Sequence, residues 1–183
     1  MTSIKEIETK IAVPGNKNIT ATLTAHFIPL IKERSFEDNW CFDFEDRRLT
    51  KTDILLRIRT ANGVSTLTLK GPAKKKSGLK FRDEWEVEIR KKSTIIKILK
   101  TLNLKLIFRY QKYRTVYKYL NSLICLDETP IGSYLELEGK EKEIIQIAAL
   151  LGFSAKHFIP LSYASLFKLY QLKQKVKCKN IVF

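Results

Sequence analysis

The sequence has few of the residues that form metal centres and disulfide frameworks, with three cysteines and two histidines among 183 residues. Cys41, Cys125 and Cys178 are odd in number and far apart, and no two have the spacing of a zinc site. We therefore interpret them as small, largely buried hydrophobic residues. His26 and His157 are also isolated in the sequence, so a metal ion would have to be held by oxygen ligands.

Long apolar segments are missing as well. No run approaches the roughly 20 residues that a membrane-spanning helix needs, and the first residues lack the apolar core of a signal peptide. A content of 44% hydrophobic and 29% charged residues is typical of a globular protein and excludes a disordered one. We expect a cytoplasmic protein with no membrane partner, and the sequence carries no signal for an oligomeric state.

Acidic residues are scarce relative to basic ones: 19 Asp and Glu stand against 34 Lys and Arg, a formal charge of +15. This excess favours attraction to polyanions. The basic residues gather in runs at 74–76, 90–92 and 173–179, which are usually solvated. The sequence has neither zinc-finger spacing nor an aromatic ribonucleoprotein motif, so these runs do not by themselves define a nucleic-acid site.

The length suits one domain, which we place at residues 1–172 and follow with a basic tail at 173–183. Charged hairpin strands with a few helices between them predict the α+β class. A short strand is expected at 40–44, a turn at 14–16, and a mobile lysine-rich loop before Gly78. Helical spacing is found at 19–27, 95–102 with a cap at Ser93, 141–151 and 162–172.

Charged residues recur at the period of a β-strand. Glu6, Glu8 and Lys10 fall on one face of an extended segment, while Ile7 and Ile11 fall on the other. The same alternation is found in four further segments with charges two residues apart. These are Arg57 and Arg59; Arg82, Glu84, Glu86 and Glu88; Lys112 and Arg114; Glu136 and Glu138.

Two structures fit this pattern. An open antiparallel sheet would expose the charged faces to water. A sheet closed into a barrel would point them into its interior and turn apolar residues such as Ile7, Leu69, Trp85 and Leu137 towards outer helices. Acids and bases inside a barrel must neutralise one another or bind ions. Carboxylates hold Mg²⁺ or Mn²⁺, and Arg and Lys bind phosphate oxygens, so a polyphosphate with a divalent metal would satisfy both sets.

The motifs, in their order, resemble those of the CYTH superfamily, the triphosphate tunnel metalloenzymes. Residues 6–10 resemble its ExExK signature, 56–59 its RxR strand and 112–114 its KxR strand. Lys70-Gly71-Pro72 and the segment at 126–132 are similar to the class IV adenylyl cyclase-like branch, and Ser162-Tyr163 resembles an SY element near the C-terminus. The resemblance covers nearly the whole chain.

The resemblance implies a closed antiparallel barrel of about eight strands with helices outside, in which a triphosphate lies along basic residues and Mg²⁺ or Mn²⁺ is held by acidic ones. It implies phosphate binding by Lys10, Arg57, Arg59, Lys70, Arg82, Lys112 and Arg114. Among these, it implies catalytic roles for Lys10, Lys70, Lys112 and Arg114. It implies metal binding by Glu6, Glu8, Glu86, Glu88, Asp127, Glu136 and Glu138. For Arg82, Glu86 and Glu88, ion pairing that only supports the barrel is an equal alternative.

Three functions follow as hypotheses. The first is conversion of ATP to cyclic AMP and pyrophosphate. The second is hydrolysis of inorganic triphosphate, thiamine triphosphate or a nucleoside or RNA 5′-triphosphate, the only form in which a nucleic acid is expected as a partner. The third is a non-catalytic polyphosphate-binding module, which the large number of carboxylates disfavours because a phosphate receptor needs fewer of them.

Overall fold

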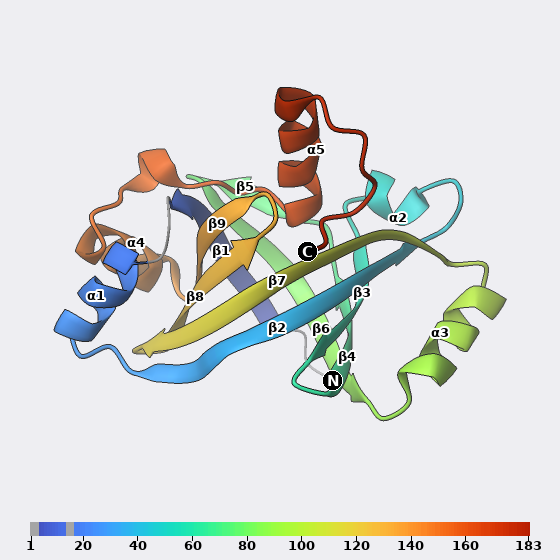
Figure 1. Ribbon diagram of the computed structural model, residues 1–183, viewed down its shortest axis with the longest axis horizontal. Helices are drawn as coiled ribbons and strands as arrows, with labels where there is room; N and C mark the ends of the chain where they lie inside the picture. Colours follow the sequence, from blue (N-terminus) through green and yellow to red (C-terminus); the bar gives the residue numbers. More distant parts are fainter. Residues whose placement is uncertain (1–3, 14–16) are drawn as a thin grey trace.

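The computed structural model describes residues 4–13 and 17–183, so the turn expected at 14–16 lies outside the described residues. Its strands are β1 (Ile4–Val13), β2 (Leu30–Asp43), β3 (Leu55–Ala61), β4 (Val64–Lys70), β5 (Lys74–Lys76), β6 (Leu79–Ile89), β7 (Lys105–Tyr119), β8 (Ser122–Thr129) and β9 (Gly132–Glu138). Its α-helices are α1 (Lys17–Ala25), α2 (Arg48–Lys51), α3 (Lys92–Thr101), α4 (Glu141–Leu150) and α5 (Tyr163–Gln174). A 3₁₀ turn spans Ala155–His157 (Figure 1).

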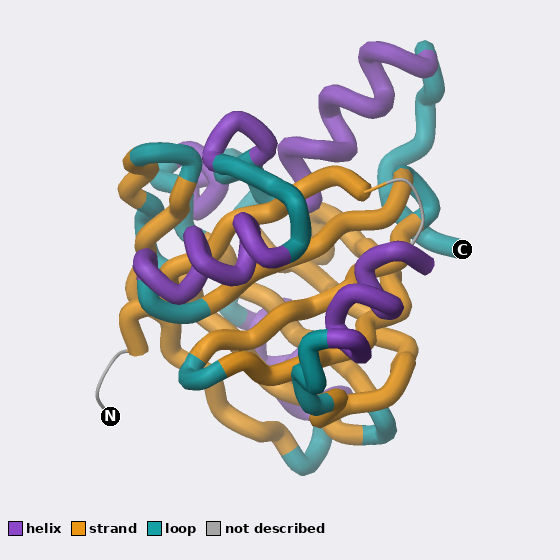
Figure 2. The backbone as a smooth tube through the Cα atoms, turned by 90° about the vertical axis from the view of Figure 1, so that its left-hand side faces the viewer, coloured by secondary structure: helices purple, strands orange, loops and turns teal. Residues whose placement is uncertain are grey.

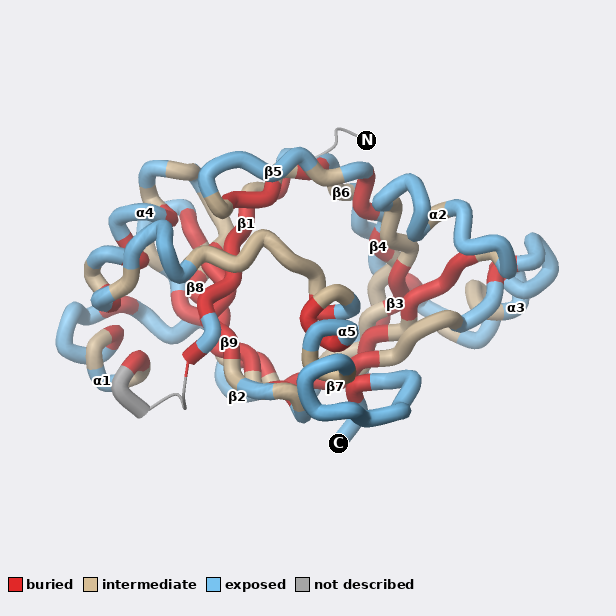
Figure 3. Tube along the Cα trace, turned by 90° about the horizontal axis from the view of Figure 1, so that it is seen from above, coloured by how far each residue is buried: buried red, intermediate tan, exposed pale blue. Residues whose placement is uncertain are grey.

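The sheet closes on itself. Its strands follow the order β1-β9-β8-β7-β2-β3-β4-β6, and β6 pairs back with β1, so that eight antiparallel strands form a barrel with β5 added along β6. Seen from above, the strands form a ring around a central space (Figure 3). The closed antiparallel barrel with outer helices that the family resemblance implied is therefore confirmed.

Helices cover the barrel at three places. α1 and α4 pack over the outer faces of β1, β8 and β9, where Ile11, Ile124 and Leu137 are fully buried. Leu99 of α3 packs on Ile58 at the far end of the barrel. The first half of α5 packs against β7 and β9, while its second half extends away from the body (Figure 2). The cores beneath α1, α4 and α3 lie outside the barrel wall, and the third core, which contains Tyr110 and Tyr163, closes the α5 end. The rest of the interior is left to the charged residues.

One part of the outer wall differs from the prediction. Ile7 and Leu137 belong to the apolar layer beneath α1 and α4, as expected. Leu69 and Trp85, which are partners in the β4–β6 register, are each 39% exposed. The alternation sets both on the face opposite Lys70 and Glu84, but it carries no information on whether a helix covers that face.

Three local predictions were wrong. β2 begins at Leu30, ten residues before the expected strand, because its register shifts and its inward-facing charges hide the apolar pattern. The lysine-rich loop is the strand β5, which pairs with β6 through a turn with positive φ at Ser77 and Gly78, a geometry that suits a tight hairpin. Ser93 lies inside α3, whose cap position is the extended Lys91.

The C-terminal segment returns to the barrel after α5. Ile181 is 1% exposed, and its backbone exchanges hydrogen bonds with Arg109 and Gln111 of β7 at 3.0 and 2.7 Å. Because β8 pairs with β7 only from Tyr113 onward, this segment occupies an edge that β8 leaves open. Of the cysteines, Cys41 and Cys125 are buried as predicted, whereas Cys178 in this segment is exposed. No described helix is long and apolar enough to cross a membrane.

Candidate functional site: a charged tunnel

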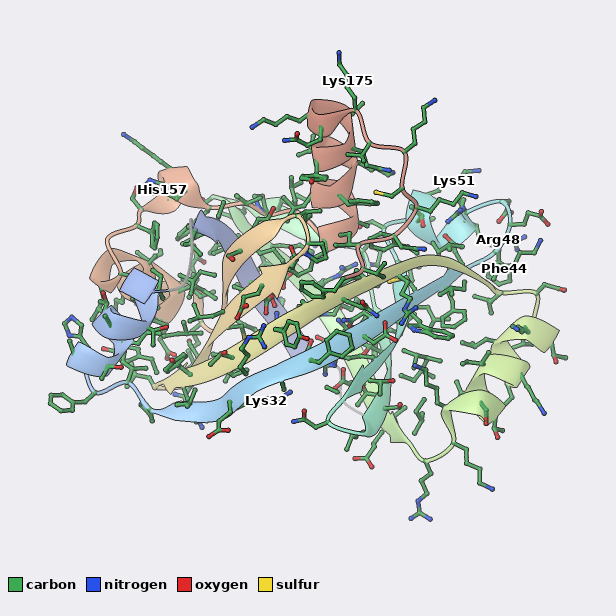
Figure 4. The ribbon with its side chains drawn as sticks, in the orientation of Figure 1. Lys32, Phe44, Arg48, Lys51, His157 and Lys175 are labelled. Carbon is green, nitrogen blue, oxygen red and sulfur yellow. The ribbon has the colours of Figure 1, made fainter. Side chains whose placement is uncertain are left out.

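The barrel encloses a cavity of about 650 Å³ whose walls carry charges of both signs. It opens at the end where the β3–β4 turn lies, and its rim includes Asn62 and Lys32, the latter on β2 at the lower edge of Figure 4. The wall includes Glu6, Glu37, Arg57, Arg59, Lys70, Glu84, Glu86, Arg114, Glu136 and Glu138. The strand alternation read from the sequence thus brings the charged residues of separate strands into one interior.

Acidic side chains gather on β1, β8 and β9. Strand pairing sets Glu8 opposite Glu138 and Lys10 opposite Glu136. The ammonium of Lys10 lies 2.7 Å from Glu136 and 3.4 Å from Glu8, all three being almost completely buried. Burial and the Glu136 charge would raise the pKa of Glu8, but the positive charges of Lys10, Lys80 and Lys70 outweigh them and lower it to about 2. Glu8 and Glu136 are therefore anions held by lysine and arginine.

Basic side chains gather on β3, β4 and β7. The Arg59 guanidinium lies 3.0 Å from Glu86, and Lys70 binds both Glu6 and Glu84. Arg57 donates to the Tyr110 hydroxyl at 3.2 Å and to Thr68 at 3.3 Å. Guanidinium groups in a shielded cavity are suited to phosphate because their planar donors match two oxygens at once.

Asp127 is the hydrogen-bond centre of the closed end of the tunnel. Its fully buried carboxylate accepts from Lys112 at 2.9 Å, from two nitrogens of Arg114 at 2.6 Å, and from the Tyr163 hydroxyl at 2.5 Å. The Tyr163 ring lies about midway between two ammonium groups, 5.2 Å from Lys10 and 5.1 Å from Lys112. Asp127 and Tyr163 thus fix the orientation of the cations that face the substrate space.

Glu138 and Glu6 are the carboxyl groups with the least compensation. Burial, together with the neighbouring charges of Glu6 and Glu136, raises the pKa of Glu138 to about 7. Burial and the charge of Glu8 likewise raise the pKa of Glu6. Among the described residues, the second oxygen of Glu6 is buried without a hydrogen-bond partner. A cation placed between these groups would stabilise both ionised carboxylates and lower their pKa values.

The carboxylates are suitable ligands for a divalent ion that prefers oxygen, such as Mg²⁺ or Mn²⁺, but they are not preorganised to hold it. Within residues 4–13 and 17–183, no three Asp, Glu, His or Cys side chains are arranged to hold a metal ion. The reason is that the carboxylates point at lysines and arginines, as Glu6 does at Lys70 and Glu136 at Lys10. Carboxylates would have to exchange these partners for the ion.

The structure separates three of the expected site residues from the tunnel centre. Glu88 is exposed, lies beyond the cavity wall, and makes no ion pair within the described chain. Glu86 is partly exposed and pairs with Arg59 near the open end. Arg82 is 5% exposed but donates to the carbonyls of Gly71 and Asp53, at the opposite end of the barrel from the rim. Most of the other expected residues line the cavity: Glu6, Arg57, Arg59, Lys70, Arg114, Glu136 and Glu138. The remaining four lie in the buried ion pairs behind this lining: Glu8, Lys10, Lys112 and Asp127.

Sequence reasoning assigned no site role to the inward-facing Lys80, Glu84 and Glu37, nor to Asp43 at the end of β2. Lys80 binds Glu8 across the β1–β6 pair. Glu84 binds Lys70, and Glu37 lies 3.6 Å from Lys112 and 3.7 Å from Lys32. Asp43 accepts from the backbone of Leu49 and Thr50 and thereby holds α2. The parity of β6 was a sufficient signal for Lys80 and Glu84, whereas Glu37 required the true start of β2 at Leu30.

A closed antiparallel barrel with an interior of paired acids and bases defines the class of fold and site. The family model described as the CYTH domain matches residues 5–152. A protein of Methanocaldococcus jannaschii named "putative adenylate cyclase" is 31% identical over 172 residues, which are 88% of this chain and 97% of that protein. The chain therefore belongs to the CYTH family, whose members generally depend on a divalent metal ion.

Solved structures share the fold. A "putative adenylate cyclase" of Vibrio parahaemolyticus superimposes with a TM-score of 0.79 at 18% identity, covering 91% of this chain and 99% of the other. A "putative adenylyl cyclase" of Hippeastrum, described as having a dominant triphosphatase activity, gives a TM-score of 0.64 at 20% identity, covering 90% and 95%. These likenesses agree with the barrel and leave the reaction of this chain open.

Proposed function

We propose that the protein is a divalent-metal-dependent enzyme that holds a triphosphate in the tunnel and converts ATP to cyclic AMP and pyrophosphate. One observation carries the proposal: Arg57, Arg59 and Arg114 line the same cavity as Glu6, Glu136 and Glu138. A bare polyphosphate needs only the cations, and a metal ion needs only the carboxylates. A cavity that buries both suits the complex of the two.

The acidic and basic side chains of the tunnel now pair with one another, and the metal ion and the phosphates would replace these partners. Glu6, Glu136 and Glu138 are the carboxylates best placed to hold Mg²⁺ or Mn²⁺, with Glu8 beside them. When bound, the ion supplies charge neutralisation at the phosphate oxygens. Lys10, Lys70 and Arg114 then turn from carboxylate to phosphate, so that no buried charge is left unpaired.

The remaining chemistry is positioning. Asp127 holds Lys112 and Arg114 in fixed orientations, and Arg114 lines the cavity. Phosphoryl and nucleotidyl transfer rely chiefly on such fixed charges, because negative charge spreads over the phosphate oxygens in the transition state. Lys10, Lys70, Lys112 and Arg114 are accordingly the proposed catalytic cations.

Hydrolysis of a triphosphate is the second candidate, and the Hippeastrum neighbour with its triphosphatase activity is the observation that favours it. The same walls serve both reactions. In cyclisation the ribose 3′-hydroxyl attacks the α-phosphorus, whereas in hydrolysis water attacks the terminal phosphorus of ATP, inorganic triphosphate or thiamine triphosphate. The non-catalytic module is less favoured because of the number of buried carboxylates.

The products distinguish the candidates. The protein is incubated with ATP, inorganic triphosphate and thiamine triphosphate, each with Mg²⁺ and with Mn²⁺, and the products are separated by anion-exchange chromatography. Cyclic AMP with pyrophosphate supports the cyclase, and orthophosphate supports the triphosphatase. We expect Glu136→Gln to abolish either product, since it removes a charge that binds both Lys10 and Arg114. Absence of turnover with every substrate and ion would refute the proposal.

A further inference from the structure

A second cavity of about 220 Å³ lies at the α5 end of the barrel, opposite the open rim. It is smaller than the roughly 300–1,000 Å³ of sites that hold drug-sized ligands, so it suits a single ring system rather than a whole nucleotide. Its walls include Leu55, Ile107 and Phe108, and its polar edge includes Ser162 and Ser165 at the start of α5.

One hydrogen-bonded pair of side chains links the linings of the two cavities. Arg57 lines the large cavity and Tyr110 lines the small one, and the Arg57 guanidinium donates to the Tyr110 hydroxyl at 3.2 Å. A phosphate group that takes over the Arg57 donor would release Tyr110. The substrate space and the small cavity are therefore neighbours along one path.

The two cavities differ in what they offer an organic group. The large cavity is walled mainly by charged and small residues. In the small cavity, Phe108, Tyr110 and Tyr163 form a continuous aromatic wall, with ring centroids 5.7 and 5.5 Å apart. Aromatic walls with a few polar groups at one edge are suited to a planar heterocycle.

The charges around the small cavity select the kind of heterocycle. Arg82 is 5% exposed, lines the cavity and, within the described chain, pairs with no carboxylate, its partners being backbone carbonyls. Lys168 adds a second cation, and Asp53 is the one acidic side chain among the described lining residues. A buried cation without a counter-ion disfavours a positively charged ring such as thiazolium and accepts a neutral base with nitrogen and oxygen acceptors.

We propose that the small cavity binds the uncharged nucleobase of a nucleoside triphosphate whose phosphates lie in the tunnel, with the Arg57–Tyr110 pair as the gate between them. This inference rests on the proposed function and narrows its substrate to nucleotides over thiamine triphosphate. Inorganic triphosphate fills the tunnel alone and does not use the small cavity.

Filling the small cavity tests the inference. Ala164 is exposed on α5 and lines the cavity, so Ala164→Phe adds a ring without disturbing the core; Leu172→Phe, at a position 78% exposed further along α5, is the matched control. We expect Ala164→Phe to lower kcat/KM for ATP about ten- to hundredfold, the value of one base-stacking contact. Values for inorganic and thiamine triphosphate should stay within about twofold, and Leu172→Phe should change none of them. An equal loss for all substrates, or no loss for ATP, overturns the inference.

Adenosine provides a readout that does not depend on turnover. Saturation-transfer NMR should detect adenosine on the wild-type protein and on Leu172→Phe, but not on Ala164→Phe. If adenosine binds in this pattern and no triphosphate is turned over, the proposed function fails and the nucleobase site stands. If inorganic triphosphate is turned over and adenosine does not bind, the nucleobase site fails and the triphosphate tunnel stands.

Discussion

At the residue scale, the carboxyl of Glu138 offers the sharpest test of the acidic wall. Its pKa of about 7 lies above the ordinary value of 4.5 because burial and the neighbouring carboxylates of Glu6, Glu136 and Glu8 disfavour the anion. Above pH 7 the group is ionised in both the folded and unfolded states, so the folded state carries the full penalty. Below pH 4.5 it is protonated in both, and the penalty vanishes. Stability is therefore lost as the pH rises from about 4.5 to 7.

We expect Glu138→Gln to stabilise the metal-free protein at pH 8, with an upper bound on the order of 3 kcal/mol for the whole shift. Urea unfolding at pH 8 and pH 4 measures the difference, which should disappear at pH 4. Glu88→Gln is the control, since Glu88 is exposed outside the cavity. Mg²⁺ should stabilise the wild type more than Glu138→Gln. Destabilisation by Glu138→Gln at pH 8 would contradict the view that the ionised Glu138 carboxylate destabilises the fold.

The sequence predicted most of the inward-facing charges and missed those that depend on strand length. Glu6, Lys10, Arg57 and Glu136 lie in short motifs with strict alternation, which any closed barrel would turn inward. Glu37 lies seven residues into a strand whose start carries no apolar pattern and whose register shifts. Its proximity to Lys112 follows from the β2–β7 pairing, which no local pattern encodes.

At the element scale, the C-terminal segment acts as a short edge strand beside β7. Ile181 is buried in the core that contains Tyr163 and Phe167, and its neighbour Val182 is 41% exposed. We expect Ile181→Ala to cost about 2–5 kcal/mol, because it removes a buried aliphatic side chain. Val182→Ala should change stability by less than about 0.5 kcal/mol. Equal effects of the two substitutions in urea unfolding would show that the segment does not dock on β7.

The junction between β9 and α4 depends on one glycine. Gly139 has φ +152°, and a Cβ at this position would overlap Ser122, which is fully buried. We expect Gly139→Ala to destabilise the protein by about 2–5 kcal/mol through strain and overpacking. Gly63 in the β3–β4 turn also has a positive φ, but its Cβ would meet open space. Gly63→Ala should therefore cost only about 1–2 kcal/mol in thermal unfolding, and an equal loss would contradict the close Gly139 packing.

Elements were predictable where periodicity was strong and neighbours did not decide the outcome. The helical spacing at 141–151 matched α4, because its apolar face packs on β1 and β9 as the pattern requires. Lys74–Lys76 form a strand despite their composition, since pairing with β6 across Ser77 and Gly78 supplies the hydrogen bonds. This pairing depends on the tertiary structure, whereas the run of lysines by itself predicted a loop.

At the scale of the whole molecule, closure of the sheet determines which charged residues are enclosed with a ligand and which remain on the outer surface. The barrel buries Arg57 at 7% exposure, whereas Lys97 on α3 stays on the outer surface. If the interior binds the triphosphate, Arg57→Gln should lower kcat/KM for the turned-over substrate about a hundredfold or more. Lys97→Gln should leave it within about twofold, although both substitutions remove one positive charge. Equal losses would indicate binding by net charge alone.

Closure of the sheet was expected from the resemblance of the ordered motifs to the CYTH family. The charges of both signs on strands far apart favoured it but fitted an open sheet as well. The sequence did not show which parts of the outer wall a helix covers. Leu69 and Trp85 have the same alternation as Ile7, yet each remains 39% exposed.

The most direct test of the tunnel is a crystal structure with a non-hydrolysable triphosphate and Mn²⁺, in which anomalous scattering locates the ion. The phosphates should lie along Arg57, Arg59 and Arg114, with the manganese peak at the Glu6, Glu136 and Glu138 side of the cavity. Phosphates on the outer lysines, or a tunnel that keeps its carboxylate–lysine pairs and holds no manganese, would contradict the account.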